Sequence, residues 1–247
     1  MSPDTLTPVV PLATTGLPRT GYAPAIVGIA FLLLRPHAKA VGTPVLHYVR
    51  QDEKVLSSPE AIQAQAFHGI TADVINLRGI SEQDACDTLA AWLDSATYVA
   101  AQEGQVVGPW RGYNMTFIRQ IFAGSSLGTE AWAQALGGYG LSGRCIMADA
   151  ADVLGSDGLL LRGKDGQPRY PKLTDVARWA RRKGHKVPTF APGVPMGPQN
   201  TVLLAASAAL ALRAERKAPV VRLPSRGTND FTSFDDAQGG EEPPWNG

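Results

Sequence analysis

The sequence lacks three features that would assign it to a special class of protein. Its two cysteines, Cys86 and Cys145, are too far apart for a CxxC ligand pair or a disulfide framework. No apolar run approaches the roughly twenty residues that a membrane span needs, and the stretch 23–34 contains a proline and a glycine. The N-terminus has no basic region followed by an apolar one, which argues against a secretory signal. We therefore expect a cytoplasmic protein with reduced thiols and no membrane partner.

Net charge is also small, because two opposite excesses cancel. The 247 residues carry a formal net charge of +1. Residues 159–186 nevertheless hold nine basic and two acidic side chains, whereas residues 228–247 hold five acidic and no basic ones. This asymmetry predicts a patch that faces a polyanion and a separate acidic tail.

Hydrophobic periodicity predicts an α/β domain. We expect strands over 8–12, 25–34 and 43–51, weaker strands at 98–101 and 106–107, and helices over 58–66, 81–96, 114–122, 145–154, 173–183 and 201–217. After Pro219 the periodicity is lost, and the composition becomes polar and rich in glycine. We therefore predict a mixed β-sheet flanked by helices over residues 1–217, and a linker with a disordered acidic tail over 218–247.

Several short segments, taken in order, are similar to one known family. They are VVPLATTGL at 9–17, AIVGIA at 25–30, HGIT at 68–71, GYNMTFI at 112–118, CIM at 145–147, PKL at 171–173 and the helical stretch 199–212. This series resembles the DEDD 3′→5′ exonucleases, including ribonuclease T and the proofreading subunits of bacterial replicases. The resemblance covers residues 9 to about 213 and implies a ribonuclease-H-like fold.

The sequence differs from the family pattern at the positions that carry the family's catalytic groups. The family hydrolyses phosphodiesters with two divalent ions, which carboxylate oxygens hold. The resemblance puts its four carboxylates at Pro11, Ala13, Ile118 and Leu204, and its general-base histidine at Gln199. None of these side chains can bind a hard cation or take up a proton near neutral pH. We therefore expect no metal, no cofactor and no hydrolysis.

The basic segment is the strongest remaining candidate for function. Its nine members are Arg162, Lys164, Arg169, Lys172, Arg178, Arg181, Arg182, Lys183 and Lys186. Arg178, Arg181 and Arg182 recur at helical spacing, so they share a face that could neutralise phosphates, or that could simply be solvated.

Four further side chains have both a structural and a functional interpretation. Tyr113 could stack on a base, whereas Phe117 at helical spacing fits a core position. Asn114 suits a helix N-cap, and His68 within HGIT is expected to brace its turn by hydrogen bonding.

The acidic tail carries aromatic residues that inert tails seldom have. Phe231, Phe234 and Trp245 lie among acids that include Asp235 and Asp236. We expect this segment to bind a protein partner or to compete with nucleic acid for the basic face.

Together these features favour a catalytically inactive, exonuclease-like accessory or scaffold protein that binds single-stranded nucleic acid weakly. Two alternatives stay open. One is an active exonuclease whose metal ligands lie elsewhere, and the other is a protein-interaction module that does not contact nucleic acid.

Overall fold

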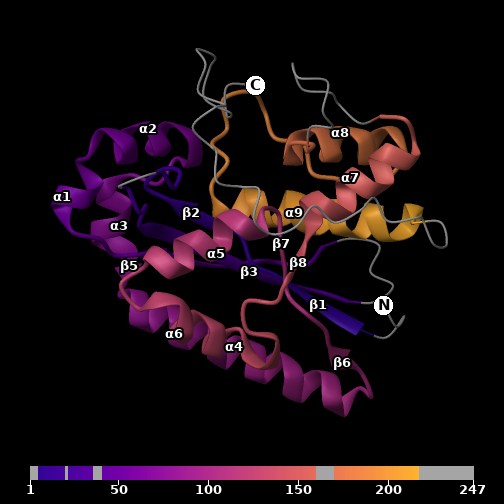
Figure 1. The fold of residues 1–247 in the computed structure, drawn as a ribbon, viewed down its shortest axis with the longest axis horizontal. Helices are drawn as coiled ribbons and strands as arrows, with labels where there is room; N and C mark the ends of the chain where they lie inside the picture. Colours follow the sequence, from indigo (N-terminus) through magenta and orange to yellow (C-terminus); the bar gives the residue numbers. More distant parts are fainter. Residues whose placement is uncertain (1–4, 20–21, 36–40, 160–169, 217–247) are drawn as a thin grey trace.

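The computed structural model describes residues 5–19, 22–35, 41–159 and 170–216. A mixed β-sheet forms its centre, and helices cover both faces (Figure 1). The principal strand order is β5-β4-β3-β1-β7-β8, with β2 paired to β3 and β6 paired to β1. This confirms the predicted α/β class with a mixed sheet flanked by helices. The predicted acidic tail, 218–247, lies outside the described residues.

The first strands pair antiparallel, and the later ones pair parallel. β1 and β4 both run antiparallel to β3, whereas β1–β7, β7–β8, β1–β6 and β4–β5 are parallel pairs. The strands described are β1 (Thr5–Val9), β2 (Leu12–Thr14), β3 (Ile26–Leu34), β4 (Val45–Val49), β5 (Gly79–Ile80), β6 (Val106–Val107), β7 (Arg111–Gly112) and β8 (Arg144–Cys145).

The helices fall into three groups around this sheet. One group, α1 (Glu53–Leu56), α2 (Pro59–His68) and α3 (Ala72–Arg78), lies at one end of the sheet (Figure 1). The second, α4 (Glu82–Gln102), α5 (Met115–Gly124) and α6 (Gly128–Ala135), contributes to the core on one face. The third, α7 (Ile146–Ser156), α8 (Leu173–Arg182) and α9 (Pro198–Glu215), covers the other face.

Strand β3 is apolar along its whole length because both of its faces are covered. Ala30, Leu32 and Leu34 pack into the core shared with α7, α8 and α9. Ile29 and Phe31 point the other way, into the core shared with α4, α5 and α6. Side chains alternate between faces along a strand, so one apolar run serves two cores. The twelve-residue apolar stretch of the sequence is thus a buried strand, as predicted. Within the described residues, no helix combines the length and apolar character needed to cross a membrane.

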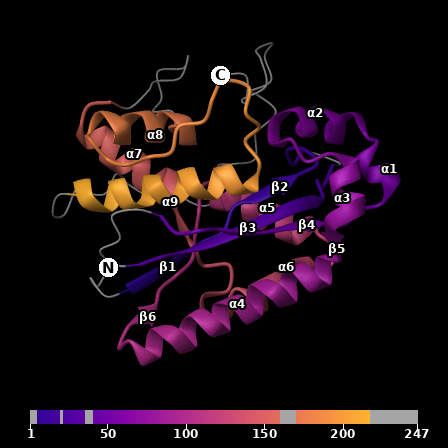
Figure 2. The same cartoon turned by 180° about the vertical axis from the view of Figure 1, so that it is seen from behind.

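Helix α9 lies across the sheet, between it and helices α7 and α8 (Figure 2). Its buried face consists largely of small side chains, with Ala205, Ala206, Ala208, Ala209 and Ala211 among them. Small side chains let a helix backbone approach the surface on which it packs. The helix is thereby held between the sheet and a second helical layer.

Each of the six predicted helices is present, and most of them extend a few residues beyond a predicted end. Ser81 caps α4, where its hydroxyl accepts from the Asp84 N–H at 3.0 Å, and Ser58 caps α2 by accepting from Ala61 N–H at 3.2 Å. The strand predicted at 98–101 was wrong, because α4 continues to Gln102. Ala96 and Ala100 keep that helix packed on the core, which outweighs the strand preference of Tyr98 and Val99.

The strand predicted over 8–12 is interrupted. β1 ends at Val9, and β2 begins at Leu12 with a bulge in its pairing to β3 between Ala13 and Thr14. Pro11 lies at the break and has no N–H to donate to a ladder. Its carbonyl still accepts from the Ala30 N–H at 3.2 Å, so β3 runs on unbroken past the gap.

The HGIT turn anchors the segment that leads into α9. His68 is buried, and its Nδ1 accepts from the Ile70 N–H at 3.0 Å, which confirms its predicted bracing role. Gly69 ends α2 at φ +69°, and a Cβ there would stand 2.6 Å from the Pro195 side chain. The Phe67 carbonyl accepts from Met196 N–H at 2.8 Å, so the turn and the start of α9 are held together.

We predict that His68 makes the fold sensitive to acid. Burial lowers the pKa of His68 from 6.5 to about 4, against a smaller opposing effect of a hydrogen bond with the Thr14 backbone. The unfolded chain therefore binds the extra proton first, and stability is lost as the pH falls from about 6.5 to about 4. The shift corresponds to roughly 3 kcal/mol of unfolding free energy.

His68→Asn keeps an acceptor for the Ile70 N–H but removes the titration. Urea unfolding between pH 7.5 and pH 4.5 should give a flatter stability curve for this variant than for the parent. His185→Asn is the matched control and should retain the steep curve, because His68 is unchanged in it. Parallel curves for the parent and His68→Asn would contradict the assignment.

Candidate functional site

The position of Ala13 is enclosed by apolar side chains from three elements. Ala13 pairs with Gly28 across β2 and β3. A Cβ built on Gly28 would stand 3.0 Å from both Ile70 Cδ1 and Pro198 Cγ, and 3.6 Å from Ala13 Cβ. The HGIT turn and the first turn of α9 therefore close over this part of the sheet. A carboxylate in place of Ala13 would enter an apolar contact zone.

Ile118 occupies a similarly crowded position on α5. Asn114 caps this helix, as predicted, by accepting from the Phe117 N–H at 3.1 Å. Ile118 is 3% exposed, and the space beside Gly112 is filled by the ends of Ile118 and Met115, so that a Cβ on Gly112 would clash with both. Phe117 packs at the edge of the same core, as its helical spacing predicted.

The two candidate positions on α9, Gln199 and Leu204, differ in their exposure to solvent. Leu204 is 3% exposed, whereas Gln199 is exposed in the first turn of the helix. Pro11, between β1 and β2, is buried as well. The four positions that the resemblance assigns to carboxylates are thus all buried and hold no polar side chain.

The described residues offer few donors that could take over metal binding. Among them, no three His, Cys, Asp or Glu side chains lie close enough together to hold a metal ion. Asp149 is on α7 in an ion pair with Arg111. The side chains at the degenerate positions do not fit a divalent ion.

Tyr113 makes a tertiary contact at the start of the α7–α8 layer. Its hydroxyl donates to the Pro171 carbonyl, and its ring packs partly buried against the core of α7, α8 and α9. Desolvation by burial is the main cause of the raised pKa of Tyr113, and nearby Asp175 adds to it. This contact fixes the ring beside the loop before α8, and its predicted stacking on a base stays a prediction.

Helix α8 separates its apolar and basic side chains onto different faces. Val176, Ala177, Trp179 and Ala180 are buried, and Trp179 donates to an Asp157 carboxylate oxygen at 3.2 Å. Arg178, Arg181 and Arg182 are exposed, as their spacing predicted. We call these three residues the α8 basic face.

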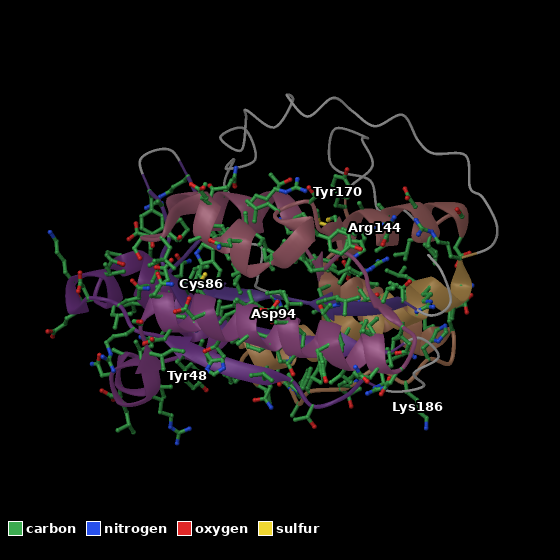
Figure 3. The ribbon with its side chains drawn as sticks, turned by 90° about the horizontal axis from the view of Figure 1, so that it is seen from below. Tyr48, Cys86, Asp94, Arg144, Tyr170 and Lys186 are labelled. Atoms are coloured by element: carbon green, nitrogen blue, oxygen red, sulfur yellow. The ribbon has the colours of Figure 1, made fainter. Side chains whose placement is uncertain are left out.

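The other predicted basic residues are distributed differently. Lys183 bridges Asp157 at 2.9 Å and Glu215 at 3.9 Å, so it links α8 to α7 and α9. Lys172 lies at the N-terminal end of α8, where its backbone N–H donates to Asp175 at 3.3 Å. Lys186 is exposed and extends outward at the edge of the molecule (Figure 3). Three predicted basic residues and the predicted tail residues lie outside the described residues. They are Arg162, Lys164 and Arg169 in the basic segment, and Phe231, Phe234, Asp235, Asp236 and Trp245 in the tail.

Two members of the α8 basic face have contacts of their own. Arg178 lies 3.4 Å from an Asp175 oxygen, at an exposed position where such a pair is weak. Arg181 donates to the carbonyls of Val187 and Pro188, so its guanidinium helps to hold the chain after α8. A carbonyl contact leaves the positive charge unneutralised, and the face therefore stays cationic.

Sequence reasoning missed a second cationic site, which gathers residues from β7, α7 and the end of α9. Arg111 is 6% exposed and forms an ion pair with Asp149, which also lies 3.1 Å from Arg216. These residues line a pocket of about 310 Å³, with Arg213 beside them. The one sequence signal was an arginine in the otherwise apolar segment VVGPWRGY.

No protein-family profile matches the sequence, and no curated protein sequence matches it either. Its similarity to known proteins lies in the fold. A product-bound exonuclease I matches 85% of this chain and 44% of its own, at 14% identity and a TM-score of 0.54. A full-length 3′-exonuclease matches 85% of this chain and 60% of its own, at 10% identity and a TM-score of 0.55. Escherichia coli exonuclease I in complex with a dT13 oligonucleotide matches 84% of this chain and 40% of its own, at 16% identity and a TM-score of 0.52.

The chain thus spans less than half the length of the exonuclease I proteins that it matches. Identities of 10–16% across these matches establish a common architecture and nothing finer. The protein shares the fold of these exonuclease structures.

Proposed function

We propose that this protein is a catalytically inactive, exonuclease-like accessory or scaffold protein that binds single-stranded nucleic acid through the α8 basic face. One observation carries the first half of this proposal. The four positions that the family resemblance assigns to carboxylates hold buried apolar residues, Pro11, Ala13, Ile118 and Leu204. Two-metal hydrolysis needs charged oxygen ligands at these points.

The packing argues further against hydrolysis at this place in the fold. Ile70 and Pro198 fill the space over Ala13 and Gly28, and Ile118 fills the space beside Gly112. A phosphodiester could reach these positions only if several packed side chains moved apart. The loss of ligands is therefore accompanied by loss of the room that the metals and the substrate would occupy.

The second half of the proposal depends on charge. Arg178, Arg181 and Arg182 present three guanidinium groups on one exposed helix face, and Lys186 is exposed nearby in the sequence. Contacts of this kind release counterions from a nucleic acid and do not depend on its sequence. The exonuclease I structure in complex with a dT13 oligonucleotide supports the choice of single-stranded DNA as the first ligand to test.

We expect no nuclease activity in the purified protein. A labelled single-stranded oligonucleotide incubated with Mg²⁺ or Mn²⁺ should keep its length, because no carboxylate occupies the degenerate positions. Shortening that co-purifies with the protein through several columns would support the alternative of an active exonuclease with other ligands.

We predict that carboxylates are poorly tolerated at the degenerate positions. Leu204→Asp should lower the free energy of unfolding by about 3 kcal/mol or more, because it buries a carboxyl group without a partner. Gln199→Asp is the matched control on the same helix. It is exposed near the helix N-terminus, so its effect should be close to zero.

The combined variant Pro11→Asp, Ala13→Glu, Ile118→Asp and Leu204→Asp tests the packing argument directly. It should melt below the parent without metal, since it buries four carboxyl groups without partners. Mg²⁺ should neither restore its melting temperature nor produce cleavage. A variant that Mg²⁺ stabilises and that then cleaves DNA would show that the space is available after all.

The binding prediction concerns the α8 basic face and the acidic tail together. Arg178→Glu with Arg182→Glu should abolish most binding to a fluorescent single-stranded oligonucleotide at low salt. Removal of residues 228–247 should tighten binding, because five acidic side chains no longer compete for the same face, and added salt should erase the gain. Arg78→Glu, an exposed charge reversal on α3, is the control and should bind as the parent does.

Two results would change the interpretation. Binding that is unaffected by the α8 reversals would place the nucleic acid elsewhere on the molecule. Complete lack of binding at low salt would favour the protein-interaction module, and the tail with Phe231, Phe234 and Trp245 would then be the first segment to test against protein partners.

A further inference from the structure

The pocket between β7, α7 and α9 is lined by more positive than negative charge. Arg111, Arg213 and Arg216 supply three guanidinium groups, and Asp149 is the one acid among the described lining residues. The two oxygens of Asp149 contact Arg111 and Arg216. The formal charges of the described lining residues sum to +2 at neutral pH, where arginine is always protonated.

Further positive charge lies next to the pocket. Arg144 in β8 is in register with Arg111 in β7, so the two side chains leave the same face of the sheet. Figure 3 labels Arg144, which is exposed. Burial lowers the pKa of Arg111, Asp149 opposes this, and Arg144 and Arg216 lower the pKa further. The neighbouring positive charges therefore act on the buried guanidinium of Arg111.

The pocket also has an apolar side. Val153 of α7 and Ala209 and Leu212 of α9 form part of its wall. Its volume of about 310 Å³ is at the lower end of the range typical of small-molecule sites. A bare phosphate ion would fill only part of such a space. Guanidinium groups on one side and aliphatic groups on the other suit a ligand with an anionic head and an apolar body.

The framework of the site is fixed before any ligand arrives. Arg111 is held by the sheet and Asp149, and the α9 residues are held by the Ala-rich contact of that helix with β3. Arg216 is the adjustable member, because its side chain is 45% exposed. A rigid guanidinium deep in a pocket and a movable one at its rim can both donate hydrogen bonds to one anion, from two sides.

We propose that this pocket binds the phosphoryl group of a nucleotide-sized ligand, with the remainder of the ligand against Val153, Ala209 and Leu212. Guanidinium groups recognise phosphate through paired N–H donors, and three of them converge here. The proposal is independent of the α8 basic face, which contributes no residue to this pocket. It is also separate from the degenerate positions, since Ala209 lies five residues beyond Leu204, about 7 Å along the helix.

Calorimetry on the full-length protein tests the proposal with three probes: inorganic phosphate, a nucleoside 5′-monophosphate and the matching unphosphorylated nucleoside. The monophosphate should bind with a Kd in the millimolar range or tighter. Phosphate should bind more weakly, and the nucleoside should not bind measurably. Absence of monophosphate binding, or equal binding of the nucleoside, would overturn the proposal.

Variants at the rim separate this pocket from other cationic surfaces. Arg213→Ala and Arg216→Ala should each weaken monophosphate binding about tenfold, since each removes a charged donor. Arg78→Ala on α3 is the matched control and should leave the affinity unchanged. Loss of affinity in the control but not at the rim would also overturn the proposal.

Asp149→Asn supplies a readout in the opposite direction. It removes the internal competitor for Arg216, so the affinity for monophosphate should rise, although the fold should melt at a lower temperature because Arg111 loses its buried partner. A merely structural role of the pocket would give the lower melting temperature without the gain in affinity. That result would count against a ligand site.

Two sources could supply the phosphoryl group, a free nucleotide or the end of a strand. A 5′-phosphorylated oligonucleotide that binds more tightly than its 5′-hydroxyl form, with the difference lost in Arg216→Ala, would identify the strand end. Equal binding of the two oligonucleotides, together with binding of the free monophosphate, would identify the nucleotide. We expect that a peptide of residues 228–247 does not displace the bound monophosphate. If the peptide binds the pocket more tightly than the monophosphate does, the pocket would be a site for carboxylates instead.

Discussion

The close contact of α9 with the sheet determines the main features of this molecule. Five buried alanines let the helix lie against β3, and Gly28 leaves room for Pro198 at the start of the helix. The residue before the HGIT turn fixes the same end from outside, because the Phe67 carbonyl accepts from the Met196 N–H. With the first turn of α9 thus placed, the direction of the helix decides which residues meet the sheet and which reach the neighbouring helices. Leu204 is buried midway as a consequence.

The two ends of α9 therefore have different chemical surroundings. At its start, Pro198 lies beside Gly28, where Ile70 and Ala13 are also close. At its end, Glu215 meets Lys183 and His185 of the α8 region, and Arg216 meets Asp149 of α7. A carboxylate buried without a partner costs several kcal/mol, so the apolar residues at the start of α9 stabilise the fold.

The sequence was informative where a signal was local. The apolar run of β3, the serine caps at Ser58 and Ser81, the Asn114 cap and the amphipathic pattern of α8 were each predictable from a few neighbouring residues. The end of α4 was not, because Tyr98 and Val99 favour strands locally, and only the tertiary burial of Ala96 and Ala100 keeps them helical. Helices α3 and α6 are short and were missed for a related reason: Ile75 and Trp132 become core residues only through contacts with distant segments.

The arginine pocket marks the limit of what sequence could offer for the site. Arg111 and Asp149 are 38 residues apart, and Asp149 and Arg216 are 67 apart, so no spacing rule connects them. Their meeting depends on the parallel pairing of β1, β7 and β8 and on the course of α9. The basic segment 159–186, by contrast, drew attention as a run, although Lys183 of that run proved to hold helices together. Local charge density identifies exposed faces, whereas a concave charged site is a property of the fold.

If the degenerate positions hold no metal, as proposed, any attraction for phosphate has to come from other groups. In a two-metal enzyme the divalent ions offset the repulsion between the carboxylates and the phosphate, so loss of both ions and acids leaves an apolar cleft with no pull on a polyanion. Guanidinium groups are the natural replacement, since they carry a permanent charge and paired donors. Here they stand on the outer face of α8 and at the C-terminal end of α9. The proposed binding without hydrolysis would depend on these two surfaces.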